Sequence, residues 1–459
     1  QIVLSRPNDY FNFFIVSAIT TSDDNPVDIT VSDVKPAFIN HILKIQKGLM
    51  MFSDNGQFLL FTESDIFSPK TARLKKIASY ECDTSIQPRD LGTSVMFTSN
   101  VSAFTRAYEA TILDDDVPPN ILEQTRVVPE YVPKDITMSA NSTPLGIVSY
   151  AKKGDSAVYH YKYFDSGDRR DQSAWYSWTL TGTLQFMVYT AGSFYTVTLQ
   201  GSDYILSRHE YVTDTTADNS YTLGGTGSDP ESPLKSARWF EACLDNMLIP
   251  EATPVYTAAS GGNPAKSVVT FRTNAANGYT PTGTTNFYAL VLGGSEAGTV
   301  VKADLVGANT ATFNNIDLSG LKVAVGYQYT STIELPHYYL ATDANKYDLD
   351  GSLRISGINF ELGVSGPMKF KLTAKNTYVN SSGQTTKEFP DFTQEESGML
   401  TGLAKLNEPP AELNKSVRVP IQKKNDKYNL QIQIPDPFST AIISASWDGI
   451  YNPRRHVRR

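Results

Sequence analysis

A strand–turn–strand unit that recurs four times between Ile2 and about Gln200 limits the fold of this chain more than any other feature. In the first unit, Asn55-Gly56 joins two apolar runs, and this pair is a strong hairpin signal because both residues tolerate positive φ. The starts lie roughly 40–50 residues apart, the spacing of four-stranded propeller blades, near Leu49, Ser94, Leu145 and Leu184. A blade cannot bury both faces alone, so several must stack around an axis. A row of hairpins within a sandwich is the alternative.

The residue types favour strands along the whole chain. The 25 Tyr and 22 Phe, with abundant Thr and Val, pack well on a pleated surface, and 30 Gly and 25 Pro supply turns. We therefore predict an all-β fold, with a β-propeller-like domain followed by further sandwich-like or barrel-like β domains.

Changes in residue composition and in the spacing of apolar residues divide the chain into three predicted domains. Residues 1–200 form the propeller-like domain, which the pattern leaves incomplete at its N-terminus. Residues 201–325 are rich in Gly, Ser, Thr and Asn, and we expect a loop-rich inserted domain that forms a distal tip, with one helix over Pro233–Met247. Residues 326–459 form a C-terminal β domain, because the segments from Leu353 and Lys427 alternate with period two.

The charge balance argues against tight binding to nucleic acid. The formal net charge is −8, so the chain as a whole repels phosphates, as most acidic soluble proteins do. Such weak repulsion would also suit a conduit along which DNA slides. No apolar run approaches the ~20 residues that a membrane-spanning helix needs, no signal peptide opens the chain, and we expect Gln1 to mark a boundary within a longer protein.

Side chains that bind metals or form disulfides give no local motif. Cys82 and Cys243 are predicted to be reduced, partly buried thiols. None of the histidines stands in a metal-binding pattern, and they are His41, His160, His209, His337 and His456. We interpret His160, in a Tyr-rich strand, as an exposed or capped strand residue.

Carboxylates cluster in three short stretches that invite comparison with glycoside hydrolases: Asp23, Asp24 and Asp28; Asp114, Asp115 and Asp116; and Glu395 with Glu396. A run in one loop does not hold two carboxyl groups across a sugar at the ~5–10 Å that this chemistry needs. We read all three as turn or loop residues.

Other catalytic or binding signatures are weak. The chain lacks a GxSxG nucleophile elbow, and Gly224, Gly225 and Gly227 do not form a phosphate-binding fingerprint. Trp175 and Trp178 could stack on a base or a sugar, but packing between sheets is the favoured interpretation.

The C-terminal tail carries charge of the opposite sign to the rest of the chain. Arg454, Arg455, Arg458 and Arg459 lie within its last six residues. We expect these arginines to contact either DNA phosphates or, preferentially, acidic side chains of a neighbouring subunit.

Several segments, in this order and spacing, resemble the tail tubular protein B, or nozzle, family of T7-like short-tailed bacteriophages. They are VLSRPNDYFNFF from Val3, DNPVD at Asp24–Asp28, GLMMFSDNGQFLLF from Gly48, FSPKTARL from Phe67, VPEYVP from Val128, the stretch Tyr159–Trp178, and WDGIYNPRR from Trp447. The stretch 205–325 carries no such segment.

This resemblance implies a structural, non-enzymatic subunit of the virion tail that is assembled in the host cytoplasm. The family forms a hexameric ring beneath a tail adaptor, or gatekeeper, with tail fibres or spikes docked at its side, and double-stranded DNA passes through it during ejection. It implies no catalytic residue, cofactor, metal or stable membrane insertion.

Two other functions stay open at this point. One is a tail-associated glycan hydrolase, and the other is a carbohydrate-binding propeller with surface Trp residues. For a conduit, we expect an acidic channel wall and a gate formed by loops of the central insertion.

Overall fold

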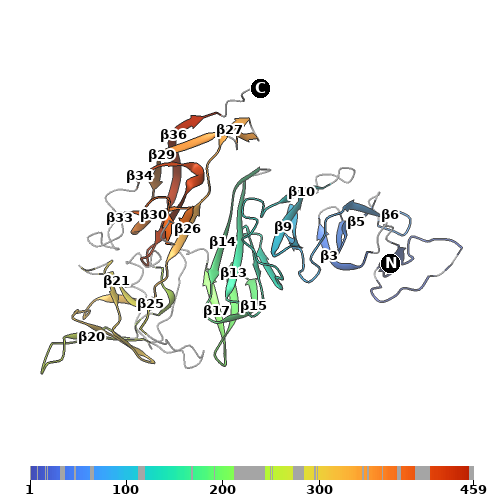
Figure 1. Cartoon of the computed structure of the whole chain (residues 1–459). Coiled ribbons are helices and arrows are strands. Elements are labelled where there is room, and N and C mark those ends of the chain that lie inside the picture. The colour runs from blue at the N-terminus through green and yellow to red at the C-terminus, as the bar shows by residue number, and fades with distance from the viewer. Residues whose placement is uncertain are drawn as a thin grey trace. The chain divides into compact units, whose positions relative to one another are not determined.

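The computed structural model places two compact units, Gln1–Thr213 (unit 1) and Asp214–Arg459 (unit 2), each described here by itself (Figure 1). The structure describes the chain except residues 1, 8, 16, 18, 31–36, 46–47, 63–66, 112–118, 167–168, 191, 211–242, 249, 251, 272–283, 294–295, 297, 344–345, 349–350, 364, 380–383, 398–413 and 454–459.

Unit 1 contains four antiparallel sheets, each built from strands that follow one another along the chain. The first sheet is β3 (Ile39–Ile45), β4 (Gly48–Ser53), β5 (Gly56–Thr62) and β6 (Ala72–Ala78). The second is β7 (Arg89–Asp90), β8 (Ser94–Val101), β9 (Phe104–Thr111) and β10 (Asn120–Glu123). The third is β11 (Met138–Ser142), β12 (Ile147–Ala151), β13 (Ala157–Ser166) and β14 (Arg169–Thr179). The fourth is β15 (Thr183–Thr190), β16 (Ser193–Gln200) and β17 (Asp203–Glu210).

Tight turns define these sheets, and all four predicted hairpins are present. In the first sheet, Ser53 pairs with Gly56, so the two-residue loop is Asp54-Asn55 and Gly56 already begins β5. In the third sheet, Gly154 adopts φ +90° between β12 and β13, a conformation that L side chains rarely adopt.

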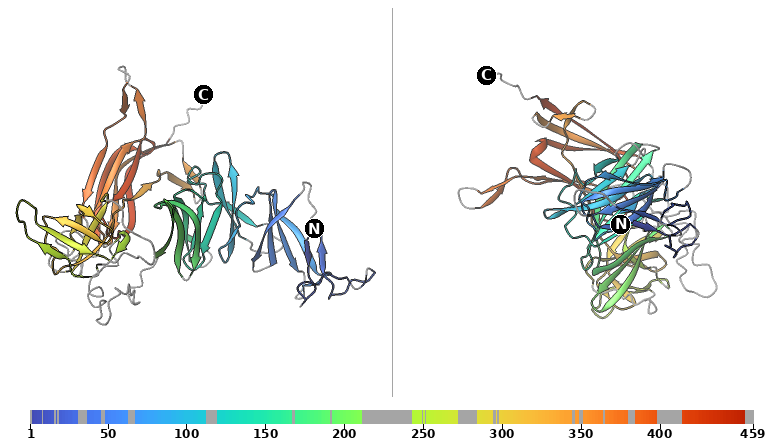
Figure 2. Two further views of the ribbon diagram at one scale, coloured as in Figure 1. Left: turned by 90° about the horizontal axis from the view of Figure 1, so that it is seen from below. Right: turned by 90° about the vertical axis from the view of Figure 1, so that its right-hand side faces the viewer.

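The four sheets of unit 1 stack face to face in sequence order, as Figure 2 also shows. One apolar core joins the first and second sheets through Phe52 and Phe97. The next joins the second and third sheets through Met96 and Tyr150, and a third core joins the third and fourth sheets through residues that include Phe194. Successive residues of one strand point to opposite faces, so Met96 and Phe97 enter different cores.

A small sheet covers the outer face of the first sheet. It consists of β1 (Ile2–Leu4) and β2 (Val27–Ile29), paired antiparallel. Ile2 packs there with Met51, Phe58 and Leu60. The first, second and third sheets therefore each bury both faces, the predicted arrangement of stacked blades; whether such a stack closes around an axis stays a prediction.

The first part of unit 2 is a sandwich of two four-stranded sheets. One sheet has the order β18 (Asp245–Leu248), β25 (Lys322–Tyr327), β21 (Phe287–Gly293) and β22 (Val300–Lys302). The other has the order β19 (Val255–Thr257), β20 (Lys266–Thr270), β24 (Thr310–Asn314) and β23 (Leu305–Val306). Phe287 of the first sheet and Phe313 of the second share one buried core.

The second part of unit 2 is another sandwich. One sheet has the order β26 (Ser331–Leu335), β35 (Tyr428–Ile434), β30 (Met368–Ala374) and β33 (Phe392–Glu396). The other has the order β34 (Lys415–Lys424), β29 (Ser352–Leu362) and β36 (Ile442–Asn452). Phe360 and Phe370 stack between the two sheets with ring centroids 5.0 Å apart. The short elements around it are β27 (Leu340–Asp343) with β28 (Lys346–Asp348), β31 (Thr377–Val379) with β32 (Thr385–Lys387), and the 3-10 helix η2 (Asn425–Lys427).

The all-β prediction is confirmed, because the described residues form antiparallel sheets throughout. The helix predicted over Pro233–Met247 is wrong at its C-terminal end, where Asp245–Leu248 is a strand paired with β25; residues 233–242 lie outside the described residues. The division at residues 200 and 325 stays a prediction. In the described part of the chain, no helix has the length and apolar character to span a bilayer.

Candidate functional site

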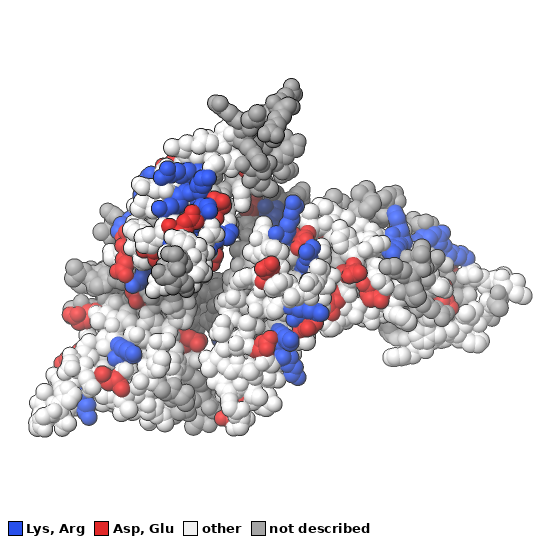
Figure 3. Space-filling model, in the orientation of Figure 1, with Lys and Arg blue, Asp and Glu red and all other residues white. Residues whose placement is uncertain are grey.

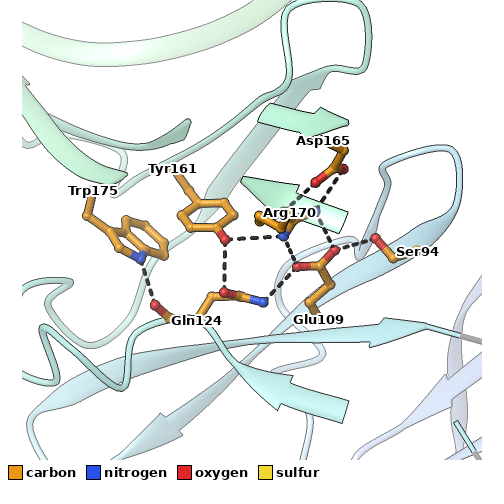
Figure 4. A network of polar contacts seen from close by, with 7 residues as sticks. All are labelled: Ser94, Glu109, Gln124, Tyr161, Asp165, Arg170 and Trp175. Carbon is orange, nitrogen blue, oxygen red and sulfur yellow. Dashed lines mark hydrogen bonds and ion pairs between the residues drawn. The ribbon is translucent and has the colours of Figure 1, made fainter. Parts of the chain in front are cut away.

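The most highly connected polar group of unit 1 lies between the second and third sheets (Figure 4). We call it the Glu109 joint, and define it as Ser94, Glu109, Gln124, Tyr161, Asp165, Arg170 and Trp175. Strand periodicity brings these side chains together. Glu109 lies two residues beyond Ala107, a residue of the core between these sheets, so its side chain points to the same face of β9.

Arg170 of β14 lies between two carboxylates. Its Nη2 donates to Glu109 Oε1 at 2.9 Å and to Asp165 Oδ2 at 3.1 Å, and its Nε donates to Asp165 Oδ1 at 2.7 Å. Nη1 forms a second bond to Glu109 and also donates to Tyr161 Oη at 3.2 Å. The planar guanidinium thus engages Glu109 of the second sheet in a bidentate pair, the geometry that suits Arg best.

Neutral groups complete the hydrogen bonding of the Glu109 carboxylate. Ser94 Oγ donates to Oε1 at 2.5 Å, and Gln124 Nε2 donates to Oε2 at 2.7 Å. Gln124 in turn accepts from Tyr161 Oη at 2.8 Å and, through its backbone carbonyl, from Trp175 Nε1 at 3.0 Å. The backbone N–H of Gln124 donates to Ala107 within the second sheet, and its other bonds lead across the interface or to Glu109.

The electrostatics of the joint follow from burial and pairing. The Glu109 side chain is only 7% exposed. Burial alone would lower the pKa of Arg170, but the bonds to Asp165 and Glu109 outweigh it, so this pKa lies above its ordinary value. Burial also raises the pKa of Tyr161, and raises that of Tyr163 to about 12. Arg170 stays a cation and Tyr161 stays a neutral donor to Gln124, so the joint keeps one bonding pattern at physiological pH.

A second polar group joins the third and fourth sheets. Ser149 Oγ lies 2.7 Å from His160 Nδ1 and 2.7 Å from Tyr189 Oη of β15. The His160 ring lies 4.5 Å from Trp178 and 4.8 Å from Tyr176, centroid to centroid. Burial, with a smaller contribution from His209, lowers the pKa of His160 to about 3, so the imidazole is neutral. Of the two alternatives predicted for His160, an exposed or a capped strand residue, the exposed one is wrong, since the residue is fully buried and its Nδ1 is hydrogen-bonded to Ser149.

Both tryptophans singled out in the sequence pack against the cores between sheets. Trp175 contacts the core between the second and third sheets, and Trp178 contacts the core between the third and fourth. The interpretation as packing residues is confirmed.

The predicted cysteines and histidines do not converge on one site. Cys82 is buried and Cys243 is half-buried, both are free thiols, and burial raises the pKa of Cys82 to about 12. Within the described residues, no three His, Cys, Asp or Glu side chains are placed to hold a metal ion. His456 lies outside those residues.

Three of the candidate carboxylates form ion pairs. Glu395 and Glu396 lie in the strand β33, which pairs with β30, so the prediction that they are turn or loop residues is wrong. Asp23 and Asp24 lie in the predicted turn, and Asp28 lies in β2. Glu395 pairs with Lys369 at 2.7 Å, Glu396 pairs with Lys415, and Asp23 lies 3.4 Å from Lys70. The other predicted residues lie outside the described residues: Asp114, Asp115, Asp116, Gly224, Gly225, Gly227, Arg454, Arg455, Arg458 and Arg459.

Sequence reasoning missed Glu109 and Arg170, the centre of the joint. One signal was available: Glu109 is a charged residue at a position of β9 that alternation with Ala107 turns inward. Its partner is 61 residues away and belongs to another sheet. The pairing of Glu109 with Arg170 can be identified only from the three-dimensional packing of the second sheet against the third.

The described residues therefore form an all-β protein of stacked sheets and sandwiches, in which polar side chains between sheets bind one another. The model of the bacteriophage nozzle protein family matches residues 1–458, and the chain belongs to that family. It is also similar to tail tubular protein gp12 of Escherichia phage T7, with 27% identity over 215 residues.

That alignment covers 46% of this chain and 26% of the T7 protein, so the chain matches about a quarter of this relative's length. The predicted resemblance to the nozzle family is confirmed. The protein is a structural component of a bacteriophage tail.

Proposed function

We propose that this protein is a subunit of the tail nozzle, where six copies form a ring that conducts the genome during ejection. The observation that carries the proposal is the match to the nozzle family over residues 1–458. In the proposal, the ring docks to the tail adaptor on one side and carries tail fibres or spikes, and assembly takes place in the host cytoplasm.

The Glu109 joint supports a role in which the subunit must resist deformation. A conduit must keep its bore while DNA passes, so neighbouring sheets should not slide. The bidentate pair of Arg170 and Glu109 fixes both the distance and the orientation between two sheets, which apolar packing alone fixes less specifically.

The charge of the chain supports passage of DNA without adhesion. The net charge is −8, and like charge opposes binding of phosphates to a wall. On the face seen in Figure 3, acidic and basic side chains intermingle in small groups. We expect acidic residues to outnumber basic ones on the wall of the channel.

Two regions have further proposed roles. Loops of residues 201–325 form the gate that closes the channel before host contact. Arg454, Arg455, Arg458 and Arg459 contact acidic side chains of a neighbouring subunit, because arginine pairs well with carboxylates at interfaces.

Mass photometry and electron microscopy of the purified chain, alone and with its adaptor, test the proposal. We expect sixfold rings with a central channel that bind the adaptor coaxially. A protein that stays monomeric with and without adaptor would contradict the ring.

No observation favours the glycan hydrolase or the carbohydrate-binding propeller. Glu395 and Glu396 are engaged in ion pairs, and Trp175 and Trp178 pack against cores between sheets. Incubation with host polysaccharide should release no reducing ends above a buffer control.

A further inference from the structure

Two histidines from different sheets lie against the same pair of aromatic rings, in the core between the third and fourth sheets of unit 1. His160 of β13 is fully buried, and His209 of β17 is half-buried. The His160 ring lies 4.5 Å from Trp178 and 5.6 Å from Phe194, centroid to centroid. The His209 ring lies 5.4 Å from Trp178 and 5.6 Å from Phe194. We call these four residues the histidine joint.

Each imidazole of the histidine joint is hydrogen-bonded to a hydroxyl group. His160 Nδ1 lies 2.7 Å from Ser149 Oγ, and His209 Nε2 lies 2.9 Å from Thr196 Oγ1. A hydroxyl can donate a hydrogen bond to a neutral imidazole nitrogen, but it carries no negative charge to stabilise an imidazolium. The joint therefore favours two neutral rings over two cations.

On the third sheet, the groups that face the joint offer no compensating charge. The titratable side chains nearest to His160 on this face are Tyr176, whose ring lies 4.8 Å away, and Lys162, two residues along β13. Lys162 has the same charge as an imidazolium, so it opposes the protonation of His160. The residues of β11 and β12 that alternate to this face are apolar or carry hydroxyl groups.

The fourth sheet offers no close partner either. Tyr189 of β15 and Phe194 of β16 face the joint. On β17, Asp203 shares the face of His209 but lies six residues away, roughly 20 Å along a strand. Positions 208 and 210 alternate to the opposite face. Among the described residues of these strands, no carboxylate is therefore placed to pair with an imidazolium in the joint.

Burial opposes a positive charge on both rings. It lowers the pKa of His160 to about 3 and the pKa of His209 to about 4. If the fourth sheet separates from the third, both rings meet water and their pKa values return to about 6.5. The separated state then binds protons that the packed state excludes, so the joint weakens as the pH falls below about 6.5. For two such groups, the equilibrium constant for separation rises roughly tenfold from pH 7 to pH 6 and roughly 500-fold from pH 7 to pH 5.

We propose that acid opens unit 1 at the histidine joint: protonation of His160 and His209 releases the fourth sheet from the third, while the first three sheets stay stacked. The fourth sheet is the last sheet of unit 1, so its release changes unit 1 where the chain continues into unit 2. The inference concerns a single copy of the chain and does not depend on the proposed ring.

Other contacts of the stack lack such a pair of histidines. The Glu109 joint contains no histidine, and its cation already has carboxylate partners. In the first sheet, His41 Nε2 lies 2.8 Å from the carbonyl oxygen of Thr84. A carbonyl oxygen accepts from an imidazolium as well as from a neutral ring, so protonation of His41 keeps that bond.

Hydrogen exchange of the full-length protein at pH 7, 6 and 5, followed by mass spectrometry, tests the proposal. The protection of backbone amides is corrected for the intrinsic exchange rate at each pH and compared between the fourth sheet (β16 and β17) and the second sheet (β8 and β9). We expect protection in β16 and β17 to fall roughly tenfold by pH 6 and several hundredfold by pH 5, and to return at pH 7. At pH 5 it should lie at least roughly tenfold below the protection of β8 and β9. Equal protection in the two sheets at pH 5 would overturn the proposal, because unit 1 would then open only as a whole.

Histidine variants assign the effect to the joint. His160→Asn and His209→Asn each remove one proton-binding group, so each should reduce the loss of protection between pH 7 and pH 5 to roughly twentyfold. His41→Asn is the matched control, since it removes a histidine of the first sheet and should leave the loss unchanged. An undiminished loss in both joint variants would assign the pH dependence to other groups and overturn the proposal. The comparison of the two sheets in the unsubstituted protein holds whether or not a variant folds.

Discussion

Unit 1 and unit 2 bury their sheets in different ways, and the difference decides where polar side chains can lie. The first three sheets of unit 1 are covered on both faces, and β12 in the third sheet is buried at all five of its positions. Strands in unit 2 alternate, and β35 follows a strict buried–half-buried pattern over seven residues. A sheet with one covered face can turn its polar residues to solvent, whereas a sheet inside a stack must satisfy them internally.

The two units also place their arginines differently. Arg170 in unit 1 binds a carboxylate that is 7% exposed, while Arg418 in unit 2 binds Asp448 on a surface where both side chains are about half exposed. The first pair is largely buried and the second is not. The four predictions below test whether this difference in burial governs stability, from the largest effect to the smallest.

Arg170→Met should destabilise unit 1 by about 3–5 kcal/mol, because it leaves the Glu109 carboxylate buried without its cation. Differential scanning calorimetry of the full chain should show a lower transition temperature for unit 1 and an unchanged transition for unit 2. A loss below about 1 kcal/mol would mean that the joint is only a surface pair.

Lowering the pH from 7 to 5 should destabilise unit 1 by about 2 kcal/mol through His160 alone. Burial lowers its folded-state pKa to about 3. The unfolded chain therefore binds the proton first, and stability falls as the pH drops below about 6.5, the ordinary histidine pKa. Urea titrations at several pH values measure the slope. His160→Asn should reduce the slope by about half, because burial also lowers the pKa of His209 in the same unit to about 4; an unchanged slope would assign the pH dependence to other groups.

Ile432→Val should destabilise unit 2 by about 1 kcal/mol, since it removes one methylene group from a close-packed core. The expected signal is a small downward shift of the unit 2 transition in calorimetry. A shift of the unit 1 transition instead would show that the two units do not unfold separately.

Arg418→Met should cost at most about 1 kcal/mol, because the pair with Asp448 is exposed. It is the matched control for Arg170→Met, with the same substitution of a paired arginine in the other unit. Equal losses from the two variants would remove the distinction between the units.

Features that depend on the order of residues within one segment, such as hairpins and one-faced strands, were predictable from the sequence. Turn residues such as Asn55-Gly56 located the hairpins, and the period of two around Leu353 and Lys427 located sheets with one buried face. Trp175 and Trp178 were predicted to pack between sheets because stacked blades often bury such residues there, and they contact the cores on either side of the third sheet.

Features that depend on how two faces meet were not predictable. Glu109 and Arg170 belong to different sheets, and a charged residue in one strand does not reveal which side chain will lie across from it. His160 was expected to be exposed or capped because the sequence does not show that the fourth sheet covers β13. Asp245–Met247 was expected to end a helix, and the pairing of Asp245–Leu248 with β25, about 80 residues later, overrides the local preference.

A density map of the virion tail at side-chain resolution tests the central claim most directly. We predict six copies of this chain around the DNA channel, with more acidic than basic side chains on the channel wall. A map that places the chain away from the channel, or that shows a strongly basic wall, would contradict the account.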